Sequence, residues 1–534
     1  MRAQPGPDIV AGLTVAVVAL PLALAFGIAS GLGAGAGLTS AIVAGFVAAM
    51  FGGSDLQVSG PTGAMTVVLV PIVAAHGPGG VLAVGMLAGA ILLLLAWSGA
   101  ARAMRFVPLP VVEGFTIGIA AVIALGQVPS ALNVSADGDR PLALAADAVN
   151  AFIASPALIA PLIAVAVTAA ILLAGGRWPR LPVALGAVAA AAVACRVFDL
   201  DIARIGELPS PLSLPSLPDV GLGDLGGLLP AALAVAALAA LESLLSATVA
   251  DAMTVGTRHD PDRELVGQGL ANLVTPLVGG VPATAAIART AVNVRAGGRS
   301  RLAAVTHSVA LLVVALAASS LVAWIPLAAL AGVLFATTAR MVDLSSVRTM
   351  LRAAPADGAV LLITAAATLF LNLVTAVLIG LGVAVIIALR AYARIASVEE
   401  RPLDTTDHAG EERTLLDRHV IAYRFDGPLF FAASHTALVD PTVRGDVRVV
   451  IFRLAHLMSL DTSGAALLAD TITTLEGRDI VVLLSGLRPE HERLLEQLGV
   501  LDRLRHENHV FASTPDAIDH ALSHLQRDGI PVAA

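Results

Sequence analysis

The stretch ELVGQGLANLVTPLVGGVPATAAIARTAVNVRAGGRSR (264–301) decides the fold of this chain. Glycine and proline (GGVP, 279–282) interrupt an apolar segment, and a run of small residues then leads to Arg289. An earlier stretch, QVSGPTGAMTVV (57–68), is interrupted in the same way by a Gly-Pro pair. Two interrupted segments at matching places in two halves of a membrane protein indicate a transporter whose substrate lies between half-helix ends.

Long charge-free stretches predict a membrane protein. Of the 534 residues, 57% are hydrophobic and 13% are charged, whereas soluble domains carry about 25% charged residues. Residues 9–54, 56–101, 302–339 and 359–389 contain no Asp, Glu, Lys or Arg. Each stretch exceeds the roughly 20 apolar residues that cross a bilayer. Backbone exposed to lipid must satisfy its own hydrogen bonds, so we expect helices.

The pattern predicts an all-α transmembrane transporter domain over residues 1–397 with about fourteen segments. The expected segments are 9–30, 34–52, 58–75, 79–99, 111–130, 156–175, 181–198, 229–252, 264–279, 284–296, 302–323, 325–340, 357–372 and 374–395. They form two halves of seven, about 8–198 and 228–397. An odd number of segments per half inverts the second copy, so we expect a 7+7 inverted repeat.

Past residue 397 the pattern changes to that of a small α/β domain, expected over residues 415–528. Strands are predicted at 419–431, 447–455 and 479–486, and helices at 463–478 and 489–504. Asp461 to Ser463 opens the first of these helices with residues that favour an N-cap. Strands that alternate with helices are typical of an α/β fold.

Charge and composition indicate location and exclude several functions. The acidic tail and the cluster Arg390, Arg394 and Arg401 predict a plasma (inner) membrane protein with both termini cytoplasmic. Cys195 is the only cysteine, which excludes an intramolecular disulfide and a cysteine metal site. We find no metal triad, nucleophile elbow or phosphate-binding loop, and nothing typical of nucleic-acid binding. The chain is therefore not predicted to be an enzyme, and no cofactor is expected.

The two interrupted segments predict an anion site. Small residues follow each break, including Thr62 in the first and Thr284, Ala285 and Ala286 in the second. They allow backbone to approach a ligand, and two facing half-helix N-termini would offer free N–H groups and positive dipole ends. The alternative is a pair of ordinary proline kinks, which membrane helices tolerate.

Glu242 is a carboxylate near the middle of about twenty largely apolar residues. A membrane carboxylate costs roughly 3 kcal/mol on insertion scales and marks an ion or proton route. Ser246 lies one turn later on the same helix face and supplies another oxygen. We predict that these two residues couple transport to H⁺ or to Na⁺, with no other metal expected. The alternative is a structural hydrogen-bond anchor between helices.

Two further side chains have open interpretations. Arg289 is two turns into its half-helix. It either lies close to the substrate or pairs with Glu242, and the alternative is that it extends to lipid phosphate. His307 is expected at a loop or interface rather than in a proton relay.

Several stretches resemble the sulfate permease (SulP) family, also called solute carrier family 26. They are DIVAGLTVAVVALPLALAFG (8–27), QVSGPTG (57–63), ESLLSATVAD (242–251), residues 263–301 and LDTSG (460–464). The tail resembles the family's STAS domain. The resemblance implies a core domain (segments 1–4 and 8–11) that moves against a gate domain (segments 5–7 and 12–14) like an elevator. It also implies a homodimer in the lipid bilayer that transports anions such as sulfate or bicarbonate.

The resemblance also implies site residues. Phe26, Thr62 and Ala285–Ala286 would line the anion pocket, with Arg289 just behind them. Sodium-coupled relatives carry Asp where this chain has Glu242, and Thr where it has Ser246 and Ile287. Ile287 lacks the hydroxyl that sodium would bind, which favours proton coupling here.

The helix that opens at LDTSG implies a regulatory position. In anti-sigma-factor antagonists the serine equivalent to Ser463 is phosphorylated; the alternative is that Ser463 only helps to cap its helix.

We therefore predict a secondary active symporter of a small inorganic anion, sulfate or bicarbonate. A passive anion channel or exchanger and a nucleobase permease of the same architecture are the alternatives.

Overall fold

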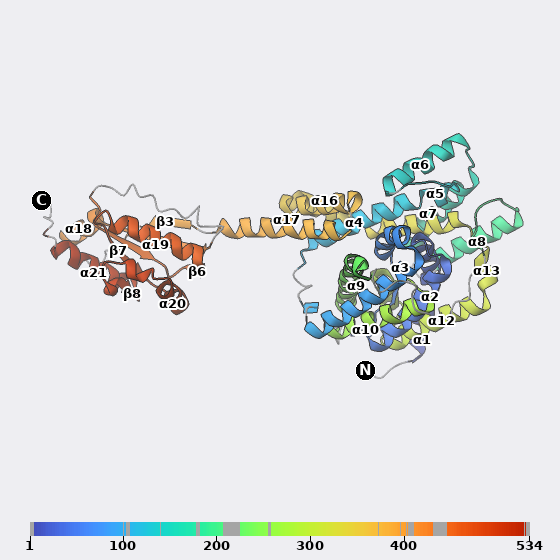
Figure 1. The fold of residues 1–534 in the computed structure, drawn as a ribbon, viewed down its shortest axis with the longest axis horizontal. Helices are drawn as coiled ribbons and strands as arrows, with labels where there is room; N and C mark the ends of the chain where they lie inside the picture. The colour runs from blue at the N-terminus through green and yellow to red at the C-terminus, as the bar shows by residue number, and fades with distance from the viewer. Residues whose placement is uncertain are drawn as a thin grey trace. The chain divides into compact units, whose positions relative to one another are not determined.

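The structure is a computed structural model that describes residues 5–99, 101–102, 107–138, 140–177, 182–206, 225–254, 258–371, 373–395, 397–401, 403, 411–430, 446–527 and 529. The chain divides into two compact units, Met1–Gly382 and Val383–Ala534 (Figure 1). Most of residues 199–227, between the two expected halves, lie outside the described residues.

The first unit is mostly helical. Its first half consists of α1 (Pro5–Ala29), α2 (Ala34–Phe51), β1 (Ser59–Gly60), α3 (Gly63–Ser98), α4 (Leu109–Gly126), α5 (Val128–Leu132), α6 (Pro141–Ala154), α7 (Ile159–Arg177) and α8 (Val183–Val197). Its second half begins with α9 (Leu225–Met253), α10 (Pro261–Val274), η2 (Thr275–Val278), β2 (Thr284–Ala285), α11 (Ile287–Arg295) and α12 (Arg301–Ala317). It continues with α13 (Ser319–Ala323), α14 (Leu327–Met341), α15 (Leu344–Ala353), α16 (Pro355–Phe370) and α17 (Leu373–Ala393).

The predicted fold class is confirmed. Among the described residues, seven helices are long and apolar enough to cross a membrane, and shorter apolar helices accompany them. Each expected segment coincides with a helix, although the third and fourth are joined in α3, which is broken at Gly77 (φ 64°) before Pro78. Helices α6 and α15 were not predicted, because neither contains an apolar stretch long enough to span a bilayer.

Helix packing separates two groups of helices. Helices α1, α2, α3, α9, α10 and α12 pack on one another, and Figure 1 shows α2 and α3 beside α9 and α10. Helices α4, α7, α8, α14 and α16 form a second group. The first group consists of helices from the core set that the resemblance implies, and the second of helices from the gate set.

The second unit is an α/β domain. Its elements are β3 (Ser397–Arg401), α18 (Glu411–His419), β4 (Val420–Leu429), β5 (Val449–Arg453), β6 (Leu457–Leu460), α19 (Thr462–Glu476), β7 (Val481–Ser485), α20 (Pro489–Gln497), η3 (Leu501–Arg503), η4 (Glu507–His509), β8 (Val510–Phe511) and α21 (Thr514–Arg527). The sheet order is β3-β4-β5-β7-β8, with β6 beside β4; β3 is antiparallel and the other strands are parallel.

Alternate residues of each strand face opposite sides of this sheet, so two cores form. Helices α19 and α20 cover one face, and α18 and α21 cover the other. The predicted strands and helices are present, with α20 shorter than expected. The predicted N-cap is confirmed, since Asp461 Oδ1 accepts a hydrogen bond from the backbone N–H of Gly464 (2.8 Å).

Candidate substrate and ion-coupling site

The two interrupted segments pair with each other. Strand β1 runs antiparallel to β2, with Ser59 opposite Ala285 and Gly60 opposite Thr284. The backbone N–H of Ala286 extends the pairing by donating to the carbonyl of Val58 (3.1 Å). A two-residue sheet thus joins breaks that lie more than 200 residues apart in the chain.

A helix begins directly after each strand of this pair. Thr62 caps α3, and its hydroxyl accepts a hydrogen bond from the backbone N–H of Met65 (3.4 Å). Ala286 precedes α11 in an extended conformation and has no capping side chain. Two helices therefore begin at the same small sheet, and the N-terminus of each carries a partial positive charge of about half a unit.

Arg289 lies behind this sheet and is only 2% exposed. Its Nη2 donates to the carbonyl oxygen of Pro61 (2.8 Å), while Nη1 has no hydrogen-bond partner among the described residues. The alternative that Arg289 extends to lipid phosphate is wrong in this structure. Its guanidinium instead places a full positive charge next to the two helix N-termini.

Gly60 is the residue that admits this guanidinium. Its φ is +153°, and a Cβ at this position would collide with Nη1 of Arg289 and approach Cα of Ala41 to 3.2 Å. Only glycine has no Cβ to place there. The glycine in the first break therefore leaves the space that the arginine after the second break occupies.

Glu242 faces the first break from helix α9. The hydroxyl of Thr62 donates a hydrogen bond of 2.8 Å to Oε2 of Glu242, and the carboxylate interacts electrostatically with Arg289. Glu242 is half-buried. The predicted coupling carboxylate, the predicted substrate threonine and the arginine thus form one cluster.

Ser246 is buried but is turned toward α11. Its Oγ donates to Oγ1 of Thr290 (3.0 Å), and the same Thr290 oxygen accepts from the backbone N–H of Val58 (3.2 Å). In the described part of the chain, Ser246 and Glu242 share no hydrogen bond. The sequence predicts that Ser246 and Glu242 share a helix face, but their side chains bond to different partners.

The remaining predicted substrate residues line the same region. Thr284 is fully buried and donates to the carbonyl of Ala239 (3.0 Å). Phe26 is 6% exposed, and its ring lies against Gly63, where a Cβ would come within 3.1 Å of Cε1. Ala285 is buried and Ala286 half-buried. The cluster is therefore most accessible near the start of α11.

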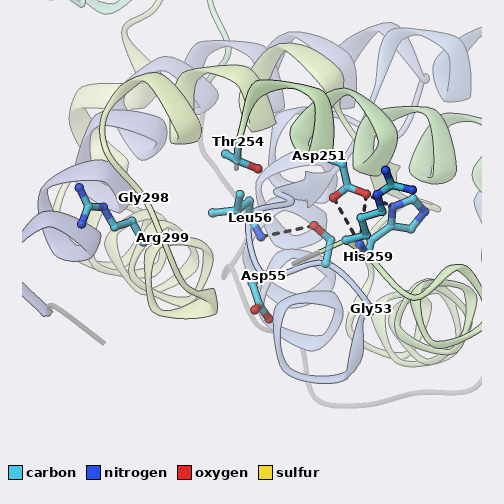
Figure 2. A pocket seen from close by; sticks show the side chains of 10 residues that line it. Gly53, Asp55, Leu56, Asp251, Thr254, His259, Gly298 and Arg299 are labelled. Carbon is cyan, nitrogen blue, oxygen red and sulfur yellow. Dashed lines mark hydrogen bonds and ion pairs between the residues drawn. The ribbon is translucent and has the colours of Figure 1, made fainter. Parts of the chain in front are cut away.

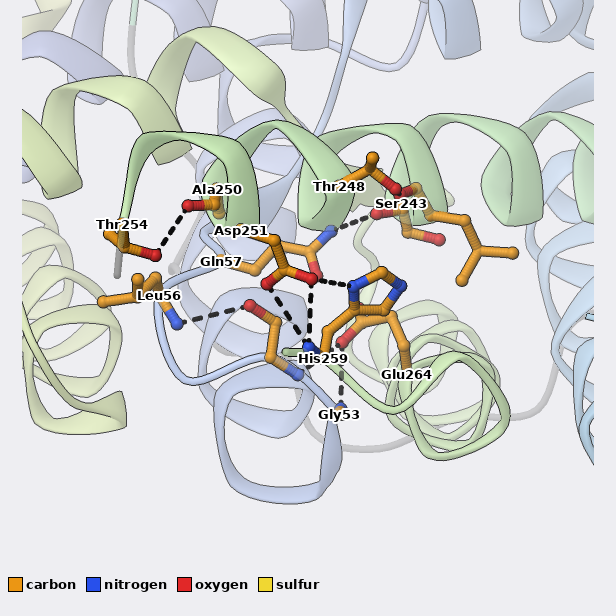
Figure 3. Close-up of polar contacts among 12 residues, drawn as sticks. Gly53, Leu56, Gln57, Ser243, Thr248, Ala250, Asp251, Thr254, His259 and Glu264 are labelled. Atoms are coloured by element: carbon orange, nitrogen blue, oxygen red, sulfur yellow. Dashed lines mark hydrogen bonds and ion pairs between the residues drawn. The ribbon is translucent and has the colours of Figure 1, made fainter. Parts of the chain in front are cut away.

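Sequence reasoning missed the amide side chains that hold the two breaks. Gln57 donates to the carbonyl of Ser243 (2.7 Å, Figure 3), and Asn293 donates to that of Leu56 (2.7 Å). Asn272 donates to the carbonyl of Ala283 (2.8 Å) and accepts from its N–H (2.9 Å). Polar amides inside apolar segments were the available signal, because burial requires each to find a partner.

Glu264 is a second buried carboxylate that we did not predict. It is 2% exposed and accepts from the backbone N–H groups of Gly53 (2.9 Å, Figure 3) and Ser54 (3.2 Å). Gln268 donates to the other oxygen of Glu264 (2.9 Å) and to Oγ of Ser59 (2.8 Å). This network fixes the loop that leads into β1. Its position in the first turn of α10 made Glu264 indistinguishable from an ordinary helix-start acid.

The prediction for His307 is wrong. We expected a loop or interface residue, but His307 is fully buried on α12 and lies against Gly45 of α2. Apolar periodicity does not distinguish a buried histidine from an interfacial one.

A cavity of about 310 Å³ lies at the far end of α9 (Figure 2). Its lining residues are Gly53, Ser54, Asp55, Leu56, Asp251, Thr254, Arg258, His259, Gly298 and Arg299. Asp251 and His259 pair at its edge, with 2.7 Å between Oδ2 and Nδ1. None of the predicted substrate residues lines this cavity, and Asp251 is roughly 13 Å along the helix from Glu242.

Ser463 lies half-buried in the first turn of α19. The cap of this helix is supplied by Asp461 rather than by Ser463.

A polytopic helical unit with two paired half-helices, followed by a small α/β domain, defines a membrane transporter class. The chain belongs to the sulfate permease family, whose profile matches residues 7–364. The STAS domain profile matches residues 414–517. The resemblance inferred from the sequence is confirmed. The chain is accordingly a multi-pass membrane protein of an anion-transporter family and not an enzyme.

Two relatives are similar to this chain over nearly its whole length. The chain is 34% identical over 508 residues to "Putative sulfate transporter YvdB" of Bacillus subtilis (strain 168), covering 93% of this chain and 94% of that protein. It is 29% identical over 532 residues to the bicarbonate transporter BicA of Synechocystis sp., covering 96% and 94%.

Solved structures agree on the fold. The transmembrane domain of a cyanobacterium bicarbonate transporter BicA matches with a TM-score of 0.62 and 31% identity, covering 72% of this chain and 98% of that one. The murine Solute Carrier 26 family member A9 anion transporter in the inward-facing state matches with a TM-score of 0.82, covering 98% and 92%. At 16% identity, the second similarity bears on the fold alone.

Proposed function

We propose that this protein is a secondary active transporter of a small inorganic anion, sulfate or bicarbonate, coupled to H⁺ or Na⁺. It would act in the plasma membrane as a homodimer with cytoplasmic termini, by an elevator-like movement of the core helices against the gate helices. The observation that carries the proposal is the β1–β2 pairing, which brings two helix N-termini together beside Arg289 and the Thr62–Glu242 hydrogen bond.

The electrostatics of the cluster suit an anion. Two helix N-termini and the guanidinium of Arg289 are positive and lie in a buried setting. Charges interact more strongly there than in water, because the effective dielectric constant is lower. Free N–H groups at the start of α11, next to the accessible Ala286, would donate hydrogen bonds to the anion.

Coupling follows from the position of Glu242. An ionised carboxylate bonded to the cap of α3 repels an anion held at the same helix end. Binding of H⁺, or of Na⁺ to the carboxylate, removes that repulsion. Anion and cation would therefore bind best together, which is the thermodynamic requirement for symport.

Two relatives support the proposal, because one is named a putative sulfate transporter and the other a bicarbonate transporter. They do not decide between the two anions. A direct measurement of transport with each anion identifies the substrate.

Uptake by proteoliposomes of the purified protein tests this function. Labelled bicarbonate and sulfate are supplied in parallel under an imposed Na⁺ or H⁺ gradient. We expect one anion to accumulate above its equilibrium level under one of the gradients. Uptake that stops at equilibrium would indicate a passive channel or exchanger. Transport that uracil or xanthine competes for, and that neither sulfate nor bicarbonate competes for, would indicate a nucleobase permease.

A further inference from the structure

Four histidines gather at one edge of the second unit. His506 and His509 form an H-x-x-H pattern that ends with η4, and His520 and His524 form an H-x-x-x-H pattern on α21. The ring of His509 lies 5.3 Å from that of His506, 5.4 Å from that of His520 and 5.3 Å from that of His524, centroid to centroid. The helical pair are 4.9 Å apart.

Three of these side chains can share one ion. Ligand nitrogens of His509, His520 and His524 all lie within 4.8 Å of one another. Tetrahedral zinc with Zn–N distances of 2.0–2.1 Å places nitrogens roughly 3.3 Å apart, so small side-chain rotations would close the site. The i, i+4 spacing that puts His520 and His524 on one helix face also occurs in helical zinc motifs.

The nitrogens of His509 need an explanation. The residue is 1% exposed, and neither ring nitrogen has a hydrogen-bond partner within the described residues. Nε2 of His520 is likewise buried without a partner there. An unsatisfied buried polar group costs about 1–3 kcal/mol. A metal ion would satisfy one ring nitrogen of each histidine that binds it.

The side chains of the cluster suit a metal ion, since all three are imidazoles. Imidazole binds metal in its neutral form. The charge of Arg505 is offset by Glu476 (3.2 Å) and Asp479 (3.0 Å). An all-imidazole set suits Zn²⁺, Cu²⁺ or Ni²⁺ and not the oxygen-preferring Ca²⁺ or Mg²⁺.

We propose that the α/β domain binds one transition-metal ion through His509, His520 and His524. The ion would tie the η4 segment, which leads into edge strand β8, to helix α21. His506 lies beside His509 but is not one of these three residues. Zinc is the probe of choice because it has no redox chemistry and accepts imidazole in tetrahedral sites.

Metal binding to the full-length protein tests the site. The protein is purified with an affinity tag that contains no histidine, stripped with EDTA, and equilibrated with ZnCl₂. Bound zinc is counted by elemental analysis, and affinity is measured by calorimetry. We expect one zinc per chain.

The half-buried helical ligands provide variants that keep the domain folded. His520→Gln and His524→Gln should each weaken zinc binding by about 100-fold, because loss of an outer-shell partner alone already costs 10- to 100-fold. His456→Gln, an exposed histidine of the same domain, is the matched control and should bind like the parent.

Hydrogen exchange provides a second readout. Zinc should slow amide exchange over residues 506–527 in the parent and in His456→Gln, but not in His524→Gln. Absence of stoichiometric zinc in the parent, or equal affinity in His524→Gln, would overturn the proposal and leave the histidines as aromatic packing.

Discussion

The hydroxyl of Thr62, which caps helix α3, donates a hydrogen bond of 2.8 Å to the carboxylate of Glu242 in the middle of α9. One oxygen therefore serves two purposes, because it also accepts from the backbone N–H of Met65. Any change in the charge of Glu242 acts directly on the helix end at which we propose the anion binds.

Glu242→Gln should abolish coupling while leaving the protein folded. The amide keeps the shape of the side chain but neither titrates nor binds Na⁺ as a carboxylate does. We expect anion uptake that no longer exceeds equilibrium under an imposed cation gradient. The matched control is Glu113→Gln, in the half-buried first part of α4, which should retain accumulation. Full concentrative uptake by Glu242→Gln would sink the coupling proposal.

Arg289→Met should weaken anion binding. The substitution retains apolar length but removes the positive charge and the hydrogen bond to Pro61. Loss of a hydrogen bond to a charged group costs about 1.5–3 kcal/mol, or roughly 10- to 100-fold in the concentration for half-maximal uptake. Arg295→Met, exposed on the same helix, is the control. Unchanged concentration dependence in Arg289→Met would contradict a role in binding.

Gly60→Ala should destabilise the paired breaks. A methyl group would collide with the Arg289 guanidinium, and φ of +153° is unfavourable for alanine. Such backbone strain costs about 1–3 kcal/mol. We expect a lower thermal midpoint in detergent and loss of uptake. Gly186→Ala, where a Cβ meets open space in α8, should change neither quantity.

Asn272→Ala tests the amide that holds the second break. The change leaves the N–H and C=O of Ala283 without their side-chain partner. Each unsatisfied buried group costs about 1–3 kcal/mol, so the thermal midpoint should fall clearly. Asn150→Ala on the exposed face of α6 is the control. Equal midpoints for the two variants would mean that Asn272 does not hold the strand.

The stability of the α/β domain should fall as the pH drops below about 6.5. Burial is the main cause that lowers the pKa of His491, against the opposing effect of Glu490. In the window between the lowered pKa and the ordinary value, the unfolded chain binds a proton that the folded domain does not, so acid favours unfolding. Exchange of amides in α20 of the full-length protein, corrected for intrinsic rates, should accelerate at pH 5.5. His491→Leu should reduce this pH dependence, and exposed His456→Leu should not.

The membrane helices and the α/β domain were predictable because their signals are local. Each of these signals acts on its own neighbourhood: the absence of charge over a bilayer's width, the two interruptions by glycine and proline, and the capping residue Asp461. The predicted boundaries therefore follow the observed helices closely. Elements without such a signal, such as α6, α15 and the edge strand β8, were missed.

The partners of the site residues were not predictable in the same way. The helical pattern put Ser246 on the face of Glu242, yet its hydroxyl bonds to Thr290 of another helix. Arg289 had two plausible directions, toward the substrate or toward lipid, and burial against Pro61 decided between them.

The sequence by itself determined that the chain crosses a membrane, that two of its membrane segments are interrupted at matching places, and that a carboxylate lies at the middle of another segment. Only the tertiary structure decided that the breaks pair with each other and that Glu242 meets Thr62 across 180 residues of chain. Helix formation and capping depend on residues within a turn or two. A buried polar side chain bonds to whatever the packing of distant helices brings near it, and no local pattern contains that information.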